Sequence, residues 1–269
     1  MNPNTVVPAS RRRFFTTLAA ASGVISTSAL SAAEGGTSPG FHEAAHSLPL
    51  NSDAEVIVCG AGPAGVAAAI TAARAGARVR LFEVHGALGG VWTSSLLGYL
   101  LDFNKPGFNQ ELVRRLRERD AINGEGKDGL SYQPEEMKVL LDELCTAAGV
   151  KVQLHTRVAS AHREGRNLTT LITESKSGRQ AWRAPVFIDT TGDGDLGALA
   201  GCEFEIGEAR SCPCQPLSMC ALLTVKDAAA LVKVIHGTGS KTKGHYQSKM
   251  EFLAEIRRAG LDPSYGHPT

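Results

Sequence analysis

A short apolar run that ends in a glycine-rich turn constrains this chain more than any other feature. Residues 55–60 read Glu-Val-Ile-Val-Cys-Gly, a pattern typical of a buried parallel strand. The turn over residues 60–65 has the spacing G-x-G-x-x-G, and the alanine-rich residues 66–75 favour a helix. A second apolar run follows over residues 78–83. The sequence therefore predicts a strand–helix–strand unit of an α/β fold with a parallel sheet.

The three glycines of this turn each have a physical role in binding a dinucleotide. Gly60 lets the strand turn sharply, Gly62 lets the backbone approach a diphosphate, and Gly65 lets helix and strand pack closely. Free amides at the helix start favour phosphate, and Glu83 stands where a carboxylate accepts hydrogen bonds from a ribose. The alternative is a structural unit with incidental glycines. The residues expected at the dinucleotide are Gly60, Gly62, Pro63, Ala64, Gly65 and Glu83.

Composition narrows the class of protein. The chain has 269 residues, enough for one large or two modest domains, with 43% apolar and 20% charged residues. Its formal net charge of +1 gives no indication of a nucleic-acid surface or of an electrostatic membrane anchor. We expect a globular protein that acts on a small-molecule substrate.

The N-terminal residues have the features of an export signal. Residues 10–15, Ser-Arg-Arg-Arg-Phe-Phe, resemble the twin-arginine pattern, and a mildly apolar run with small residues behind it follows. We predict a signal peptide over residues 1–33 and a linker over residues 34–53, with a disordered basic tail as the alternative. Hydroxyls and glycines dilute the apolar run too much for a stable membrane span. The predicted location is periplasmic or otherwise extracytoplasmic, reached in folded form.

The segment after Glu83 continues the same kind of fold. Gly89 and Gly90 follow the second strand directly and predict a loop whose backbone lies close to a ligand. The further predicted elements are a helix over residues 108–121, a polar glycine-rich loop over 122–132, a helix over 134–148, a strand over 150–155, a β-meander through 158–174 and a buried strand over 184–189.

In this order, the motifs resemble FAD-dependent oxidoreductases of the group related to the A subunit of heterodisulfide reductase. The resemblance covers about residues 53–220, and its most specific part is Ile-Asp-Thr-Thr-Gly-Asp-Gly-Asp over residues 188–195. It implies a Rossmann-like FAD-binding domain over residues 54–205. It also implies that particular residues lie beside FAD, with the backbone of Val158 at the adenine: Gly89, Gly90, Val158, Gly192 and Asp193. From their chemistry, Asp193 and Asp195 can accept sugar hydroxyls, bind a cation or cap the next helix.

Six cysteines fall into two groups. Cys59 lies in the first strand and Cys145 on an apolar helix face, so both are expected to be core thiols. The other four are close together in the sequence, and the resemblance to the heterodisulfide-reductase group makes a [4Fe–4S] cluster one interpretation. Their spacing matches neither ferredoxin pattern, so a disulfide involving Cys202, or unpaired thiols, are the alternatives. These four are Cys202, Cys212, Cys214 and Cys220.

The C-terminal residues 206–269 indicate part of a second, mainly β substrate domain. Proteins of the resembling family continue well beyond this length, so we expect a C-terminally truncated form of that architecture. The predicted function is an exported FAD-dependent oxidoreductase. The alternatives are a catalytically incomplete nucleotide-binding fragment or partner subunit, and an NAD-dependent dehydrogenase. No catalytic acid or base is assigned, although His85, His155 and Trp92 are polar or aromatic candidates.

Overall fold

A computed structural model describes most of the chain from residue 43 to residue 207, and one helix beyond it. The chain divides into two compact units, residues 1–46 and 47–269. The predicted signal peptide and most of the predicted substrate domain lie outside the described residues. The residues described are Gly40, 43–126, 129–207, 224, 226–227 and 244–260.

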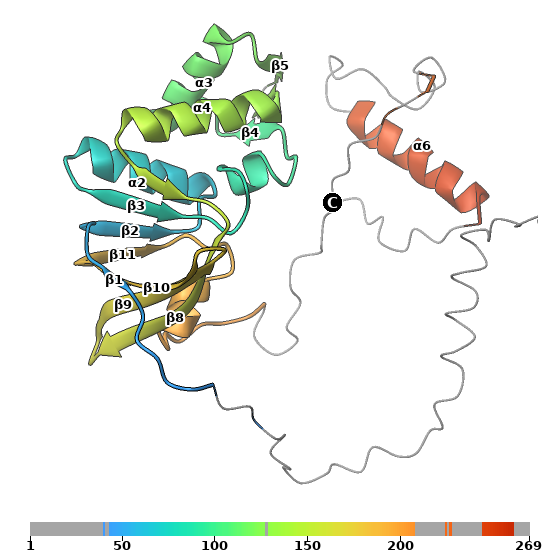
Figure 1. The fold of residues 1–269 in the computed structure, drawn as a ribbon. Helices are drawn as coiled ribbons and strands as arrows, with labels where there is room; N and C mark the ends of the chain where they lie inside the picture. Colours follow the sequence, from blue (N-terminus) through green and yellow to red (C-terminus); the bar gives the residue numbers. More distant parts are fainter. Residues whose placement is uncertain are drawn as a thin grey trace, which may run out of the picture. The chain divides into compact units, whose positions relative to one another are not determined.

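A four-stranded parallel sheet forms the centre of the second unit (Figure 1). Its strand order is β11-β2-β3-β7, and every neighbouring pair is parallel. Helix α2 (Pro63–Arg74) connects β2 to β3, as the glycine turn and alanine-rich run predict. The mixed α/β fold with a parallel sheet is thereby confirmed. The strands are β2 (Val56–Cys59), β3 (Val79–Phe82), β7 (Lys151–Gln153) and β11 (Val186–Asp189).

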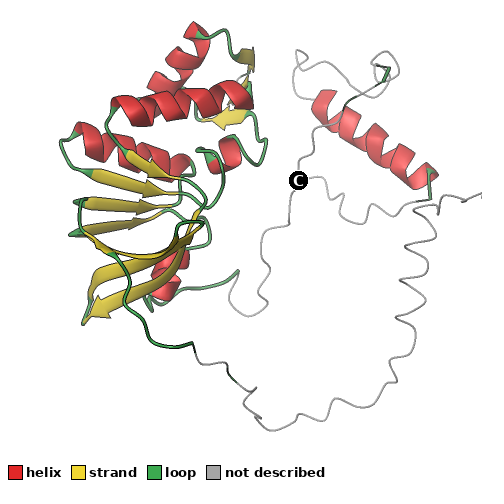
Figure 2. Ribbon diagram, in the orientation of Figure 1, coloured by secondary structure: helices red, strands yellow, loops and turns green. Residues whose placement is uncertain are grey.

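Helices cover one face of this sheet. Alternate strand residues such as Val58 and Leu81 join Ile70 of α2 in one apolar core, because successive side chains of a strand point to opposite faces. The same core includes the inward faces of α3 (Phe108–Glu118) and α4 (Pro134–Ala147). Figure 2 shows these helices stacked on one side of the sheet.

A β-meander covers the opposite face. Strands β8 (Thr156–Glu164), β9 (Asn167–Ser175) and β10 (Gly178–Arg183) pair antiparallel in sequence order. Their inner side chains form a second core with the other set of strand residues: Ile57, Cys59 and Phe82 contact Val158, Leu171 and Trp182. Strand β1 (Leu50–Asn51) pairs parallel with β10. Residues 50–51, near the end of the segment predicted as a linker, therefore belong to the sheet that contains the β-meander.

The prediction of a loop over residues 122–132 is wrong. That segment forms β5 (Ile122–Glu125) and β6 (Gly129–Tyr132), which pair with each other, and β6 also pairs with β4 (Tyr99–Leu101). Leu130 and Tyr132 are almost fully buried in the helix-side core. Glycine and charged residues on the exposed side of the hairpin conceal these two inward positions in the sequence.

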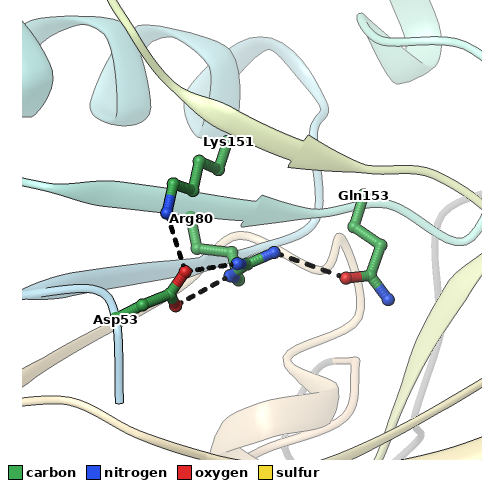
Figure 3. Close-up of polar contacts among 4 residues, drawn as sticks. All are labelled: Asp53, Arg80, Lys151 and Gln153. Carbon is green, nitrogen blue, oxygen red and sulfur yellow. Dashed lines mark hydrogen bonds and ion pairs between the residues drawn. The ribbon is translucent and has the colours of Figure 1, made fainter. Parts of the chain in front are cut away.

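A polar cluster stands on the meander side of β3 (Figure 3). Arg80 donates to Asp53 at 2.7 Å and lies over the ring of Trp182, 4.3 Å from its centroid. Lys151 also donates to Asp53, at 2.8 Å, and Gln153 accepts a 3.5 Å hydrogen bond from Arg80. Hydrogen bonds from Arg80 and Lys151 lower the pKa of Asp53 from 3.8 to about 2. The cluster fixes the chain just before β2 against the sheet.

Three shorter or separate helical elements complete the described residues. A 3-10 turn, η1 (Gly90–Trp92), follows β3, and α5 (Asp195–Leu199) follows β11. Helix α6 (Gly244–Arg258) lies beyond a stretch that is not described. Within the described part of the chain, no helix combines the length and apolar character that crossing a bilayer requires.

Candidate nucleotide-binding site

A cavity of about 900 Å³ opens where β2, β3 and β11 end. The carboxyl ends of parallel strands are where open α/β sheets bind ligands. Most residues predicted from the sequence to contact a dinucleotide line this cavity, although they come from five separate segments. The predicted residues that line it are Gly60, Gly62, Pro63, Ala64, Glu83, Gly90, Val158, Gly192 and Asp193.

The glycine turn between β2 and α2 is shaped by close backbone contacts. Gly60 has φ +92°, and a Cβ there would overlap the carbonyl of Thr190. A Cβ on Gly65 would overlap the Gly60 carbonyl and come within 2.8 Å of the Thr190 hydroxyl. By contrast, a Cβ on Gly62 would meet nothing within 4 Å. Gly60 and Gly65 thus make room for protein, whereas Gly62 leaves open space in the cavity wall.

The start of α2 faces the cavity without a protein cap. Gly62 is the N-cap residue, Pro63 is the first helical residue, and no side chain of the described chain caps this end. The first turn contains no acidic residue. The first amides of an α-helix lack intrahelical partners and carry the positive end of the helix dipole. This end of α2 therefore fits an anionic group such as a diphosphate.

Glu83 follows β3 and is held by two backbone amides. Its side chain is 5% exposed. One carboxylate oxygen, Oε2, accepts a 2.6 Å hydrogen bond from Ala61 N–H, and the other, Oε1, accepts a 2.8 Å hydrogen bond from His85 N–H. Each carboxylate oxygen has a second lone pair. The carboxylate is therefore oriented by the protein and can still accept hydrogen bonds from a diol in the cavity.

The Gly89–Gly90 pair packs directly against the glycine turn. Gly89 N–H donates a 2.7 Å hydrogen bond to the carbonyl of Ala61. A Cβ on Gly90 would lie 3.0 Å from the Cα of Gly62. Gly90 lines the cavity, whereas Gly89 and Gly65 lie outside its lining and shape the backbone behind it. The sequence predicts a loop at Gly89 and Gly90, which the structure has, but it does not distinguish the residue that lines the cavity from the residue that shapes the backbone behind it.

The loop after β11 is organised by Asp189. Its Oδ1 accepts hydrogen bonds from Thr191, from N–H at 3.0 Å and from the hydroxyl at 2.7 Å. Its Oδ2 accepts a 2.7 Å hydrogen bond from Gly197 N–H, in the first turn of α5. The helix cap suggested for Asp195 is wrong, because its side chain makes no cap hydrogen bond. Asp189 accepts from Gly197 N–H, and the Thr191 hydroxyl accepts a 2.7 Å hydrogen bond from Asp195 N–H. Asp193 and Asp195 remain exposed and line the cavity.

The first residues of β8 also line the cavity. Thr156, Arg157 and Val158 lie there beside His85. The register of β8 against β9 shifts between Val158 and Ser160, a β-bulge that interrupts the regular ladder beside Val158. Of the candidate catalytic residues, only His85 lines the cavity, and it is exposed; His155 and Trp92 lie outside the lining.

The described cysteines do not form a metal site. Burial raises the pKa of Cys59 and of Cys145 to about 12, which agrees with the prediction that both are core thiols. Cys202 is exposed with a free thiol. The other three cluster candidates, Cys212, Cys214 and Cys220, lie outside the described residues. Among the residues the structure places, no group of three or more His, Cys, Asp or Glu side chains could hold a metal ion.

Comparison with known families shows which family the chain belongs to. A family model described as FAD dependent oxidoreductase matches residues 55–264, which include every element that lines the cavity. The chain belongs to this family. Its relation to heterodisulfide reductase remains a prediction, and so does its truncation. No curated protein matches the sequence.

Solved structures with a similar fold are distant in sequence. A geranylgeranyl bacteriochlorophyll reductase-like protein from Thermoplasma acidophilum has 18% identity and a TM-score of 0.44, over 57% of this chain and 43% of that one. p-Nitrophenol 4-monooxygenase from Pseudomonas putida has 15% identity and a TM-score of 0.41, over 52% and 41%. A myxobacterial chondrochloren halogenase, described as FAD-dependent, has 19% identity and a TM-score of 0.40, over 52% and 37%. The chain thus matches about two fifths of the length of these proteins.

Sequence reasoning missed several residues of the cavity. Thr190 and Asp189 stand in the Ile-Asp-Thr-Thr-Gly stretch, and that motif was the signal that could have found them. Arg157 and the pair Ser94–Ser95 also line the cavity, with no local pattern to mark them. Their place in the lining depends on tertiary packing between segments that are distant in the sequence.

Proposed function

We propose that this protein is an FAD-dependent oxidoreductase that binds FAD in the cavity at the ends of β2, β3 and β11. Family membership supports the cofactor class. The observation that carries the proposal is the uncapped start of α2, with open space at Gly62 and an oriented carboxylate at Glu83 beside it. These groups suit the diphosphate and the ribose of the ADP half of FAD.

The residues of the cavity have distinct roles in this proposal. Amides at the start of α2 bind the diphosphate, and Glu83 accepts hydrogen bonds from the adjoining ribose diol. The interrupted ladder at Val158 presents backbone to the adenine. Gly192 and Asp193 also line the cavity, where the exposed carboxylate of Asp193 can accept sugar hydroxyls. When bound, the flavin supplies the redox chemistry, while the protein orients it and sets its electrostatic surroundings.

The charge distribution around the cavity supports this orientation. Asp193 and Asp195 stand on the β11 side, and Arg157 stands on the β8 side. Carboxylates repel a diphosphate, so in this proposal the phosphates bind the amides at the start of α2 and not the side chains of these aspartates. In this proposal the substrate is a small molecule that reaches the flavin.

An absorbance spectrum and an FAD titration test the proposal. Purified protein is expected to carry flavin absorbance or to bind added FAD with a change in flavin fluorescence. Protein that binds NAD but not FAD would support a dehydrogenase instead. Protein that binds FAD but is not reduced by any donor would support a catalytically incomplete fragment or partner subunit.

We also propose export by the twin-arginine route. The support is the sequence Ser-Arg-Arg-Arg-Phe-Phe over residues 10–15, together with a cofactor that would be inserted before export. Replacing Arg11 and Arg12 by lysine in the full chain is expected to keep the protein in the cytoplasm of a twin-arginine-competent host. Unchanged export of that variant would refute the route while leaving the flavin proposal intact.

A further inference from the structure

We infer that Thr190 is a positioning residue for the proposed FAD site: it orients Glu83 through the peptide bond between Gly60 and Ala61. This inference depends on the proposed function only for its effect on FAD. The contacts that support it lie within the protein itself. Thr190 comes from the end of β11, about 130 residues after the glycine turn that it contacts.

Thr190 packs directly against the backbone of the glycine turn. Its hydroxyl donates to the carbonyl of Gly60 at 2.7 Å and lies 2.9 Å from the carbonyl of Cys59, which also accepts its N–H at 2.8 Å. A Cβ on either Gly60 or Gly65 would collide with Thr190. The absence of side chains at these two positions thus accommodates Thr190, the residue that directly follows β11.

The peptide between Gly60 and Ala61 is held at both ends. Its carbonyl oxygen accepts the Thr190 hydroxyl, and its N–H donates to Oε2 of Glu83 at 2.6 Å. A trans peptide unit is planar, so its C=O and N–H point in opposite directions. Fixing the carbonyl toward Thr190 therefore fixes the N–H toward Glu83, which directly follows β3.

This peptide needs such a constraint because glycine precedes it. Gly60 has φ +92° and no Cβ, so other orientations of the following peptide are open to it. In the reversed orientation the carbonyl oxygen would face the Glu83 carboxylate and repel it. The carboxylate would then lose one of its two orienting amides and move from the position in which it meets a ribose. Thr190 prevents that reversal.

A double-mutant cycle tests this coupling. Thr190→Val keeps the shape of the side chain and removes the hydroxyl. It is expected to weaken FAD binding about tenfold, the size of one lost hydrogen bond to a partly buried acceptor. In a Glu83→Ala background the same change is expected to cost less than about twofold, because the group that Thr190 positions is absent. Equilibrium dialysis measures all four dissociation constants, including weak ones.

Two further variants separate positioning from general stability. Thr190→Ser restores the hydroxyl and should bind FAD within about twofold of wild type. Thr173→Val is the control for loss of a threonine hydroxyl, because the Thr173 hydroxyl accepts the Trp182 indole N–H at 2.7 Å and Thr173 does not line the cavity. It should lower stability without changing FAD affinity. An equal loss of affinity in Thr173→Val, or an equal effect of Thr190→Val in both backgrounds, would overturn the inference.

A measurement without FAD keeps the inference independent of the proposed function. The Ala61 amide should exchange with deuterium at least tenfold faster in Thr190→Val than in wild type, since its hydrogen bond to Glu83 depends on the hydrogen bond from Thr190 to the Gly60 carbonyl. Thr173→Val should leave that rate unchanged relative to neighbouring amides. Unchanged exchange at Ala61 would refute the positioning role of Thr190 even if wild-type protein binds FAD. Faster exchange in a protein that does not bind FAD would support that role and refute the proposal that FAD is the cofactor.

Discussion

Replacing Glu83 by glutamine should damage the site far more than its small chemical change suggests. In the wild type both carboxylate oxygens accept amide hydrogen bonds, from Ala61 at 2.6 Å and from His85 at 2.8 Å, and the side chain is 5% exposed. Glutamine has one oxygen and one NH₂ group. Whichever way it is turned, its NH₂ must face one of the two amide donors.

The expected loss of free energy follows from the glutamine NH₂ group facing a backbone N–H donor. A buried donor left without an acceptor costs about 1–3 kcal/mol, and a ribose hydroxyl bonded to a neutral amide in place of a carboxylate loses roughly another 1 kcal/mol. Part of this cost falls on folding and part on binding. We expect FAD affinity to decrease by about one to two orders of magnitude, because each tenfold change corresponds to about 1.4 kcal/mol.

A fluorescence titration with FAD and a urea unfolding curve measure the two parts for Glu83→Gln. Glu111→Gln is the matched control: Glu111 pairs with Arg74 on the surface of α2, at 2.6 Å, and lies outside the cavity lining. That control should bind FAD as wild type does. If Glu83→Gln bound FAD with unchanged affinity and unfolded at the same urea concentration, the assigned role of the two amides would be wrong.

Three more predictions concern other parts of the molecule. Gly62→Ala should fold like wild type, since its Cβ would meet no protein atom, but should not bind FAD in a titration. Asp53→Asn should lower the free energy of unfolding by roughly 0.5–1 kcal/mol at pH 7, given partial exposure. Because the folded pKa of Asp53 is lowered from 3.8 to about 2, this difference should persist above pH 4, decrease below it, and be lost as the pH falls through 2 in urea titrations. Cys59, with its pKa raised to about 12, should resist iodoacetamide at pH 8 until the protein is unfolded, as peptide mass spectrometry would show.

Local patterns in the sequence were enough to predict the first part of the fold. The strand, glycine turn and helix that begin at residue 55 follow from spacing and composition, because each signal acts over a few residues. The same patterns failed for residues 122–132, where two strands pair through a hairpin that carries glycine and charge on its open side. There the burial of Leu130 and Tyr132 depends on contact with helices, which no local pattern reports.

The site shows the same division between local and long-range information. The sequence indicated that Gly62 and Glu83 would lie at one site, since the motif sets them just after two adjacent parallel strands, and both line the cavity. It did not indicate that Thr190 fills the space left by Gly60, or that Asp189 caps α5. Those contacts depend on β11 pairing with β2, a neighbour distant in the chain.

Titration of the wild-type protein with the separate halves of the cofactor tests the central proposal most directly. If amides at the start of α2 and the Glu83 carboxylate hold the ADP half, ADP should displace FAD from one shared site, and FMN, which lacks that half, should bind far more weakly than FAD. FMN binding as tight as that of FAD, or FAD that ADP cannot displace, would contradict this account of the cavity.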